Sequence, residues 1–303
     1  MGKLSEYALI ASLFMTIGAF AMYLAYAISG LRAARLQTAG AVMTSGTVMV
    51  SGPRTAAIGK YASILGWLAT ITLLASLTFR TIATGHGPFA NMYEFSSAFS
   101  FGILAAYVWF ERKYHQRLLA LVALPVAAAM TGYALTIPPD IEPLVPALQN
   151  NLLLTVHVAV AIIAYGSFAI AFAASLIYLF QVFIAWLQSR EEAGIWGLPK
   201  LSVLDEIGYR AVVVGYPFLT LTIILGAVWA DTAWGSYWTW DPKETASLVT
   251  WLIYGAYLHA RVMRGWRGTR AASLLVLGFA ATLFTYFGNL FFGGLHSYSG
   301  LGN

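Results

Sequence analysis

Histidine is the side chain in this sequence best suited to bind a metal or carry a proton, because the chain contains no cysteine. The absence of cysteine excludes structural disulfides, thiolate metal sites and thiol–disulfide chemistry by this chain. The five histidines are His86, His115, His157, His259 and His296. Imidazole ligation and imidazole proton transfer therefore remain as the chemistry to consider.

A second unusual feature is the segment WGSYWTWDPKE, residues 234–244, which crowds four aromatic residues into seven positions. These are Trp234, Tyr237, Trp238 and Trp240. Indole rings offer a flat ligand broad apolar contact and offset stacking. Gly235 would let the backbone approach such a ligand closely. The alternative is an interfacial aromatic belt, but a belt spreads its Trp and Tyr over many helix ends. The crowding therefore favours a binding surface.

Asp241 follows these aromatic residues and precedes Pro242 and Glu244. Asp suits the N-cap of a helix, Pro suits the first turn, and Glu three residues after the cap completes a capping-box pattern. We therefore predict that Asp241 mainly caps the helix that follows.

The composition predicts a membrane protein. Hydrophobic residues make up 59% of the 303 residues and charged residues only 10%, and the mean hydropathy is +0.73. A soluble domain carries about 25% charged residues. We expect an all-α polytopic membrane protein of one domain, residues 1–303, with membrane lipid around it. The net charge of +5 does not indicate nucleic-acid binding, because the basic residues are spread over separate connections.

Apolar segments long enough to cross a bilayer predict about eight transmembrane helices. They lie at 5–29, 61–82, 90–110, 118–137, 151–187, 209–230, 244–263 and 271–293. The first apolar run is as long as a full span, so we interpret it as a retained helix rather than a cleaved signal peptide.

The basic residues predict the orientation. Four alternate connections hold most of the seventeen lysines and arginines: Arg32, Arg35, Arg54 and Lys60; Arg112, Lys113 and Arg117; Arg190, Lys200 and Arg210; Arg261, Arg264, Arg267 and Arg270. The other side has Lys3, Arg80 and Lys243. The positive-inside rule places the first set in the cytoplasm. Both termini and the loop 231–244 are then on the outer, periplasmic or extracellular, face.

Two histidines fall at outer helix ends that flank the tryptophan-rich loop. His157 lies about two turns into the fifth span and His296 lies just past the eighth. Two imidazoles across an aromatic surface suit a haem iron with two axial nitrogen ligands. Taken singly, each could equally be a hydrogen-bonded interfacial residue. Arg80 or Lys243 could pair with the haem propionates or could be a snorkelling anchor.

The other three histidines differ in their surroundings. His259 lies fifteen residues after Glu244, about 22 Å along a helix, in the inner part of the membrane. Ionisable groups there are usually functional. Gly255, one turn away, either leaves room for a bulky group or packs against a helix. His86 either contributes to the site or supports a Gly/Pro turn, and His115 is expected in a solvated cytoplasmic loop.

Three motifs resemble a known family. WGSYWTWDPKE resembles the tryptophan-rich WWD signature of haem-handling proteins of cytochrome c maturation, which include CcsA (ResC), CcmC and CcmF. GHGPFANMYEF at 85–95 and GNLFFGGLHSYSG at 288–300 are similar to motifs of the CcsA type in particular. The resemblance covers most of the chain from about residue 60.

The resemblance implies roles for particular residues. His157 and His296 match the two external haem ligands, and His259 matches the membrane-embedded histidine. Trp234, Trp238, Trp240 and Asp241 match the signature itself. Haem b is then the cargo, brought to the outer face of a bacterial inner or plasma membrane, or of a thylakoid membrane.

The family also implies partners. With a CcsB (ResB) membrane protein the chain would form a cytochrome c synthase that joins haem to the CXXCH motif of apocytochrome c, and a thioredoxin-like protein would reduce the client thiols. This chain is too short to include a CcsB portion, so a separate partner is expected.

Three alternatives remain open. A CcmC-type protein would deliver haem to a chaperone without ligation. A cytochrome b-like subunit would transfer electrons, and a transporter would need no cofactor.

Overall fold

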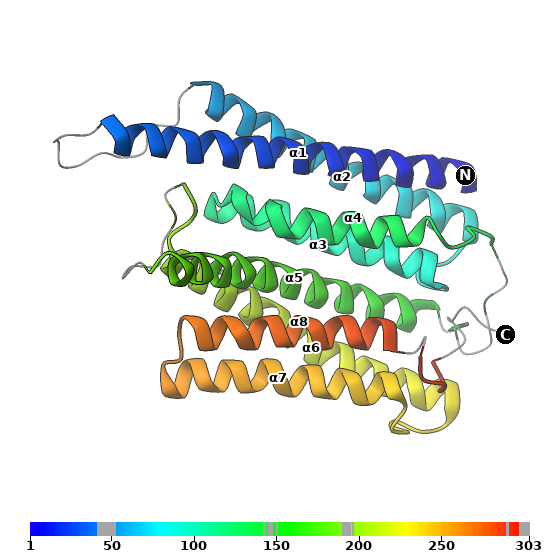
Figure 1. Cartoon of the computed structure of the whole chain (residues 1–303). Coiled ribbons are helices and arrows are strands. Elements are labelled where there is room, and N and C mark those ends of the chain that lie inside the picture. Colours follow the sequence, from blue (N-terminus) through cyan, green and yellow to red (C-terminus); the bar gives the residue numbers. More distant parts are fainter. Residues whose placement is uncertain are drawn as a thin grey trace.

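The all-α prediction is confirmed by a computed structural model that describes residues 1–40, 53–141, 144, 148–149, 151–189, 195, 197–288 and 291–296. Within these residues the regular structure is helical, with no strand. The helices are α1 (Gly2–Gly40), α2 (Pro53–Thr84), α3 (Met92–Tyr114), η1 (Arg117–Leu119), α4 (Ala120–Ala134), α5 (Asn151–Leu187), α6 (Leu201–Trp234), α7 (Pro242–Arg264) and α8 (Thr269–Phe287). The eight α-helices run side by side and alternate in direction (Figure 1).

Six of the described helices are long and apolar enough to span a membrane: α1, α2, α4 (counted from Arg117), α5, α6 and α8. The chain is therefore a polytopic membrane protein. Both α3 and α7 have 23 residues, about 34 Å of helix, which also exceeds the ~30 Å hydrocarbon core. They bury carboxylates such as Glu94 and Glu244, which lowers their apolar character. The count of eight spans stays a prediction.

Several helices extend beyond the apolar segments found in the sequence. Helix α6 begins at Leu201, eight residues before the predicted span, and includes the exposed ion pair between Glu206 and Arg210. The run of apolar residues marks only the part of a helix that lies in the hydrocarbon. The helix itself extends further, as long as its backbone hydrogen bonds continue. Helix α8 ends earlier than predicted, at Phe287.

Small residues let the central helices approach closely. A Cβ added at Gly166 of α5 would collide with the backbone carbonyl oxygen of Gly102 on α3, and one at Gly102 would lie 2.8 Å from the carbonyl oxygen of Ile162. Close backbone contact of this kind replaces the hydrophobic drive that is missing between helices in lipid. It fixes α5, which carries His157, against α3.

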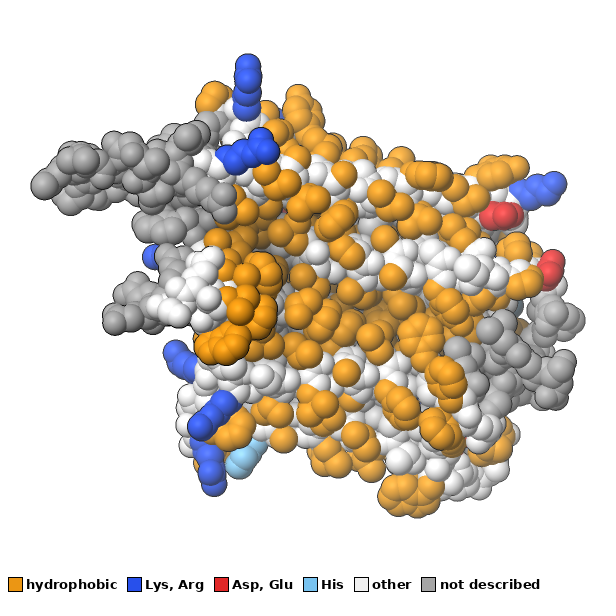
Figure 2. Space-filling view, viewed as in Figure 1, with side chains coloured by type: hydrophobic (Ala, Val, Ile, Leu, Met, Phe, Trp, Pro, Cys, Tyr) orange, Lys and Arg blue, Asp and Glu red, His pale blue; other side chains and the backbone are white. Residues whose placement is uncertain are grey.

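The two ends of the bundle differ in charge and in composition. We name as the loop end the one that carries residues 85–91, 235–241 and 291–296, and the N-terminus lies there too (Figure 1). Most Lys and Arg side chains visible in Figure 2 gather at the opposite end, with an apolar surface between the ends. Arg190, one of the predicted basic residues, lies outside the described part of the chain. This distribution agrees with the predicted orientation, while the side of the membrane stays a prediction.

A buried ion pair ties the connections together at the loop end. Arg80 Nε on α2 donates to Glu94 Oε1 on α3 at 2.8 Å, and both side chains are less than 5% exposed. The two other guanidinium nitrogens donate to the carbonyl oxygens of Pro139 and Asp140. Glu94 Oε2 accepts from the N–H of Ala90. The Arg80 guanidinium is therefore committed to structure, which disfavours it as a partner for a propionate.

We predict that Arg80→Met lowers the free energy of unfolding by about 3–5 kcal/mol, because Glu94 stays behind as a buried charge without its partner. Arg210→Met is the control, since it breaks an ion pair whose side chains are 50% and 44% exposed; its cost should stay below about 1 kcal/mol. Unfolding of the detergent-purified variants, followed by circular dichroism, measures the difference. Equal losses in both variants would contradict the role given to Arg80.

Candidate functional site

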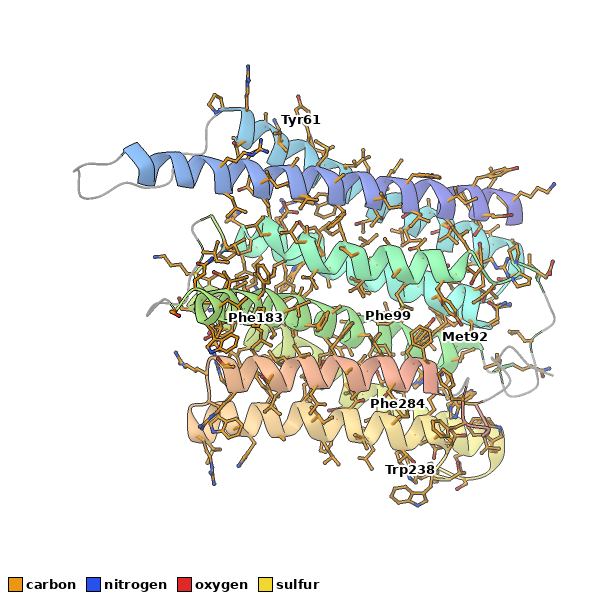
Figure 3. All side chains as sticks on the ribbon, in the orientation of Figure 1. Tyr61, Met92, Phe99, Phe183, Trp238 and Phe284 are labelled. Atoms are coloured by element: carbon orange, nitrogen blue, oxygen red, sulfur yellow. The ribbon has the colours of Figure 1, made fainter. Side chains whose placement is uncertain are left out.

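A cavity of about 990 Å³, part of it open space, lies at the loop end. Helices α3, α5, α6, α7 and α8 and the segments next to them form its wall. Its lining includes Phe89, Met92, Phe95, His157, Trp229, Tyr237, Trp238, Lys243, Glu244 and His296. Met92 and Trp238 can be seen at this end of the bundle in Figure 3.

His157 presents an imidazole to this cavity from the second turn of α5. Gly226 on α6 makes room for the ring, because a Cβ there would lie 2.9 Å from His157 Cε1. Nδ1 of His157 is buried and has no hydrogen-bond partner within the described residues. A buried polar nitrogen is normally satisfied, so this one is available to a group bound in the cavity.

His296 reaches the same cavity from the segment after α8, and Asp241 orients it. Nδ1 of His296 lies 2.9 Å from Asp241 Oδ1, and the backbone N–H of His296 donates to Oδ2 at 3.4 Å. Burial raises the pKa of Asp241, but the hydrogen bonds from His296 and from the N–H of Lys243 outweigh it and lower the pKa to about 2. Asp241 is thus an ionised acceptor and Nδ1 is the donor. In the neutral ring the lone pair is then on Nε2, as in carboxylate–histidine–metal arrangements.

The protonation of His296 also suits a metal ligand. Burial lowers its pKa below 6.5, the hydrogen bond to Asp241 opposes this, and the positive charge of Lys243 lowers it again. The net change is downward, so the imidazole is neutral at pH 7. Metals bind the neutral imidazole.

Asp241 has two roles, of which the sequence revealed one. It is the N-cap of α7, and with Glu244 it forms the predicted capping box, which is confirmed. Its second role, holding His296, depends on Gly294: a Cβ there would collide with Asp241 Oδ2 and lie 2.9 Å from Pro242 Cδ. Glycine at 294 therefore lets the segment before His296 pass directly over the helix cap.

Trp229 on α6 is a site residue that sequence reasoning missed. Its ring stacks on that of His157, with centroids 6.5 Å apart and planes at 15°, and lies 5.7 Å from that of His296. It was hidden inside an apolar segment interpreted only as a span. The signal that could have found it is helical spacing, because Thr222, Gly226 and Trp229 occupy one face of α6 and all line the cavity.

The aromatic residues of the loop do not all face the cavity. Tyr237 and Trp238 line it, and Trp234 packs edge-on against His296 at 4.9 Å. Trp240 is 69% exposed and has a positive φ of 59°. Gly235, with φ 75°, is the C-cap that ends α6, and nothing lies within 4 Å of an added Cβ. Glycine is therefore favoured at position 235 by its left-handed backbone conformation, and not by a close approach of another group.

The remaining histidines lie apart from this cavity. His86 contacts the carbonyl oxygen of its neighbour Gly87 through Nδ1 and does not line the cavity, although its loop contributes Phe89. His259 is exposed on α7, toward the basic end. Of the two alternatives for Gly255, the helix-packing glycine is confirmed, because the hydroxyl of Tyr216 on α6 would lie 2.8 Å from an added Cβ.

Comparison with known proteins gives this arrangement a family. The family model described as "Cytochrome C assembly protein" matches residues 89–296, which include His157, His296 and the tryptophan-rich loop. The chain belongs to this family. Proteins called "Cytochrome c biogenesis protein CcsA" are similar to it: that of Gloeobacter violaceus is 36% identical over 290 residues, covering 77% of this chain and 85% of the relative.

Two further CcsA proteins give the same result. That of Guillardia theta is 38% identical, covering 77% of this chain and 84% of the relative, and that of Synechocystis sp. is 34% identical, covering 76% and 85%. The resemblance to the CcsA type is therefore confirmed. A role in cytochrome c biogenesis follows, and with it the handling of haem in general.

We predict that Gly294→Ala releases His296 from Asp241, because the new methyl group collides with the carboxylate. A hydrogen bond to a charged group contributes about 1.5–3 kcal/mol, so the detached ring should become roughly tenfold more populated, or more. Carbethoxylation of His296 by diethyl pyrocarbonate, followed by mass spectrometry, should speed up accordingly. Gly293→Ala is the matched control, since nothing lies within 4 Å of its Cβ. Equal rates in both variants would show that Gly294 does not position His296.

Proposed function

We propose that the protein binds haem b in the cavity at the loop end, with His157 and His296 as the two axial ligands of the iron. The observation that carries this proposal is that two imidazoles, which differ in their hydrogen bonding, line one cavity. His157 has an unsatisfied buried nitrogen, and His296 is oriented by a carboxylate. Bis-histidine ligation of haem requires two neutral rings that reach one iron.

The aromatic residues support this assignment. The ring of Trp229 lies beside both imidazole rings, with centroids 6.5 Å from that of His157 and 5.7 Å from that of His296, so a porphyrin held between the two histidines would lie close to this indole. Tyr237 and Trp238 offer further flat surfaces in the cavity wall, and Trp234 restrains His296. Trp240 does not line the cavity, and we assign it to the surface of the loop.

In this function the chain presents haem and does not supply the nucleophile. The thiol of a client cysteine adds across a haem vinyl group: a carbon–sulfur bond forms, and the thiol proton goes to the neighbouring vinyl carbon. No electrons are gained or lost in that addition. The residues of this chain orient the macrocycle, and the histidine of the client CXXCH motif then replaces one of the two imidazoles as ligand.

A second membrane protein of the CcsB (ResB) type completes this activity in our proposal. The supporting observation is His259, a histidine exposed on an apolar helix face beside Ala256 and Met263. Ionisable groups on such a face are costly unless something covers them. A partner helix with a further histidine would cover His259 and give an inner haem site.

We further propose that the loop end faces the periplasm, the extracellular space or the thylakoid lumen. The concentration of basic residues at the opposite end supports this orientation through the positive-inside rule (Figure 2). Client apocytochrome c would then meet the haem on the side where cytochromes c function.

Absorption spectra of the detergent-purified protein test the haem site. The wild type should show low-spin haem b when oxidised and when reduced with dithionite, and His157→Ala combined with His296→Ala should lose it. His115→Asn is the control: it changes a histidine at the basic end whose positive φ of 54° asparagine tolerates. Retention of the same low-spin spectrum by the double variant would place the haem elsewhere, with His259→Ala as the next variant to examine.

Deletion of the gene tests the role against electron transfer. In a maturation defect, apocytochrome c accumulates and covalently bound haem, detected by haem staining, is lost, while cytochromes b remain. The defect should be restored by the wild-type chain and not by the double histidine variant. Normal covalent haem attachment in the deletion strain would support the electron-transfer alternative instead, and haem transferred to a chaperone without a CcsB-type partner would support the CcmC-type alternative.

A further inference from the structure

Lys243 is a cation placed where the fold itself does not favour one. It is the second residue of α7, and the N-terminus of a helix carries partial positive charge that favours anions. Among the described residues it is also the one lysine or arginine that lines the cavity with the two histidines. The helix dipole therefore does not explain a lysine at this position.

No described acid forms an ion pair with Lys243, although two acids lie nearby. Asp241 is committed to His296 and to the backbone N–H of Lys243 itself. Glu244 uses Oε2 to accept from the N–H groups of Thr239 and Asp241, as part of the capping box. Its other oxygen, Oε1, is buried and without a partner, yet it is not within ion-pair distance of the ammonium.

The contact that Lys243 does make is with an aromatic ring. Its Nζ lies 5.4 Å from the centroid of the Phe95 ring, which is another residue of the cavity wall. A ring face attracts a cation more weakly than a carboxylate does when both are available. The ammonium thus faces a cavity lined by aromatic rings, two imidazoles and the carboxylate of Glu244, and no described acid is close enough to form an ion pair with it.

We propose that Lys243 is the anion subsite of this cavity and takes a propionate carboxylate of the bound haem. This inference rests on the proposed function and adds what that function leaves open, namely the rotation of the macrocycle about the iron. The two axial histidines fix the plane of the ring, while a single cation on one side fixes which edge carries the propionates. The vinyl groups lie on the opposite edge of haem, so this contact directs them away from Lys243 and toward the client.

The test compares two ligands that differ only in the carboxylates: haemin and haemin dimethyl ester. Each is titrated into the purified haem-free protein, and the Kd is taken from tryptophan quenching and from the Soret absorption. The wild type should bind haemin roughly ten- to hundredfold more tightly than the ester, as expected for a hydrogen bond between charged groups. This comparison needs no variant, so a misfolded variant cannot hide its result.

Variants then assign the effect to one residue. Lys243→Met should weaken haemin binding to the level of the ester and leave the ester unchanged, and Lys243→Arg should retain the preference. Lys113→Met is the matched control, because Lys113 likewise places its Nζ over an aromatic ring, 4.5 Å from Trp109, but at the basic end. Its Kd values should equal those of the wild type.

The other outcomes overturn the proposal in distinguishable ways. If the wild type binds both ligands equally, Lys243 does not hold a propionate, and an anion of another source, such as a lipid phosphate, becomes its partner; the haem site itself stands. If Lys243→Met weakens both ligands equally, the lysine supports the fold and not the carboxylate. If the wild type binds neither ligand, the proposed haem site is wrong and the subsite is wrong with it.

Discussion

The carboxylate of Asp241 is the group on which the arrangement at the loop end depends. It is 2% exposed, and it accepts from the N–H of Lys243, from Nδ1 of His296 and from the N–H of His296. One buried charge thereby begins α7, fixes the ring of a candidate ligand and holds the last described segment of the chain against the loop. Such a charge is tolerated because every contact is a hydrogen bond and because it lies at a helix N-terminus. Glycine at 294 is the steric condition for the arrangement.

Arg80 is a second buried charge with a comparable role at the loop end. Arg80 joins α2 to α3 and also holds the carbonyl oxygens at Pro139 and Asp140, after α4. These polar contacts add to an apolar cluster at the same end, in which Phe89 and Leu148 from the connections pack with Trp229. The two buried charges together hold four segments at the loop end: the connections after α2, α4 and α6 and the segment after α8.

The sequence predicted the helices well, because apolar length and charge are strong signals in a membrane protein. It also predicted the capping box, which is a local pattern, and it selected His157 and His296, which the structure brings to one cavity. It could not show that Asp241 binds His296, because 55 residues separate them and no local sequence pattern links the two. Trp229 was not predicted as a site residue for a related reason. A tryptophan is common in an apolar segment, and its role becomes evident only when its neighbours in the fold are known. The sequence also left open whether Gly255 leaves room for a bulky group or packs against a helix, because Tyr216, which fills the space, lies on another helix.

The helices differ in whether they line the cavity. The cavity wall comes from α3 onward, and the family match also begins at residue 89, just before α3. Neither α1 nor α2 contributes a lining residue, and each packs mainly on the other and on α3 and α4. Helix α2 is linked to the site by Arg80, which reaches the connections beside the cavity, and by Leu77, which packs in one cluster with the cavity residues Leu148 and Trp229. The chemistry therefore resides in α3 to α8 and the segments between them, and the first two helices act on it only through the positions of those segments.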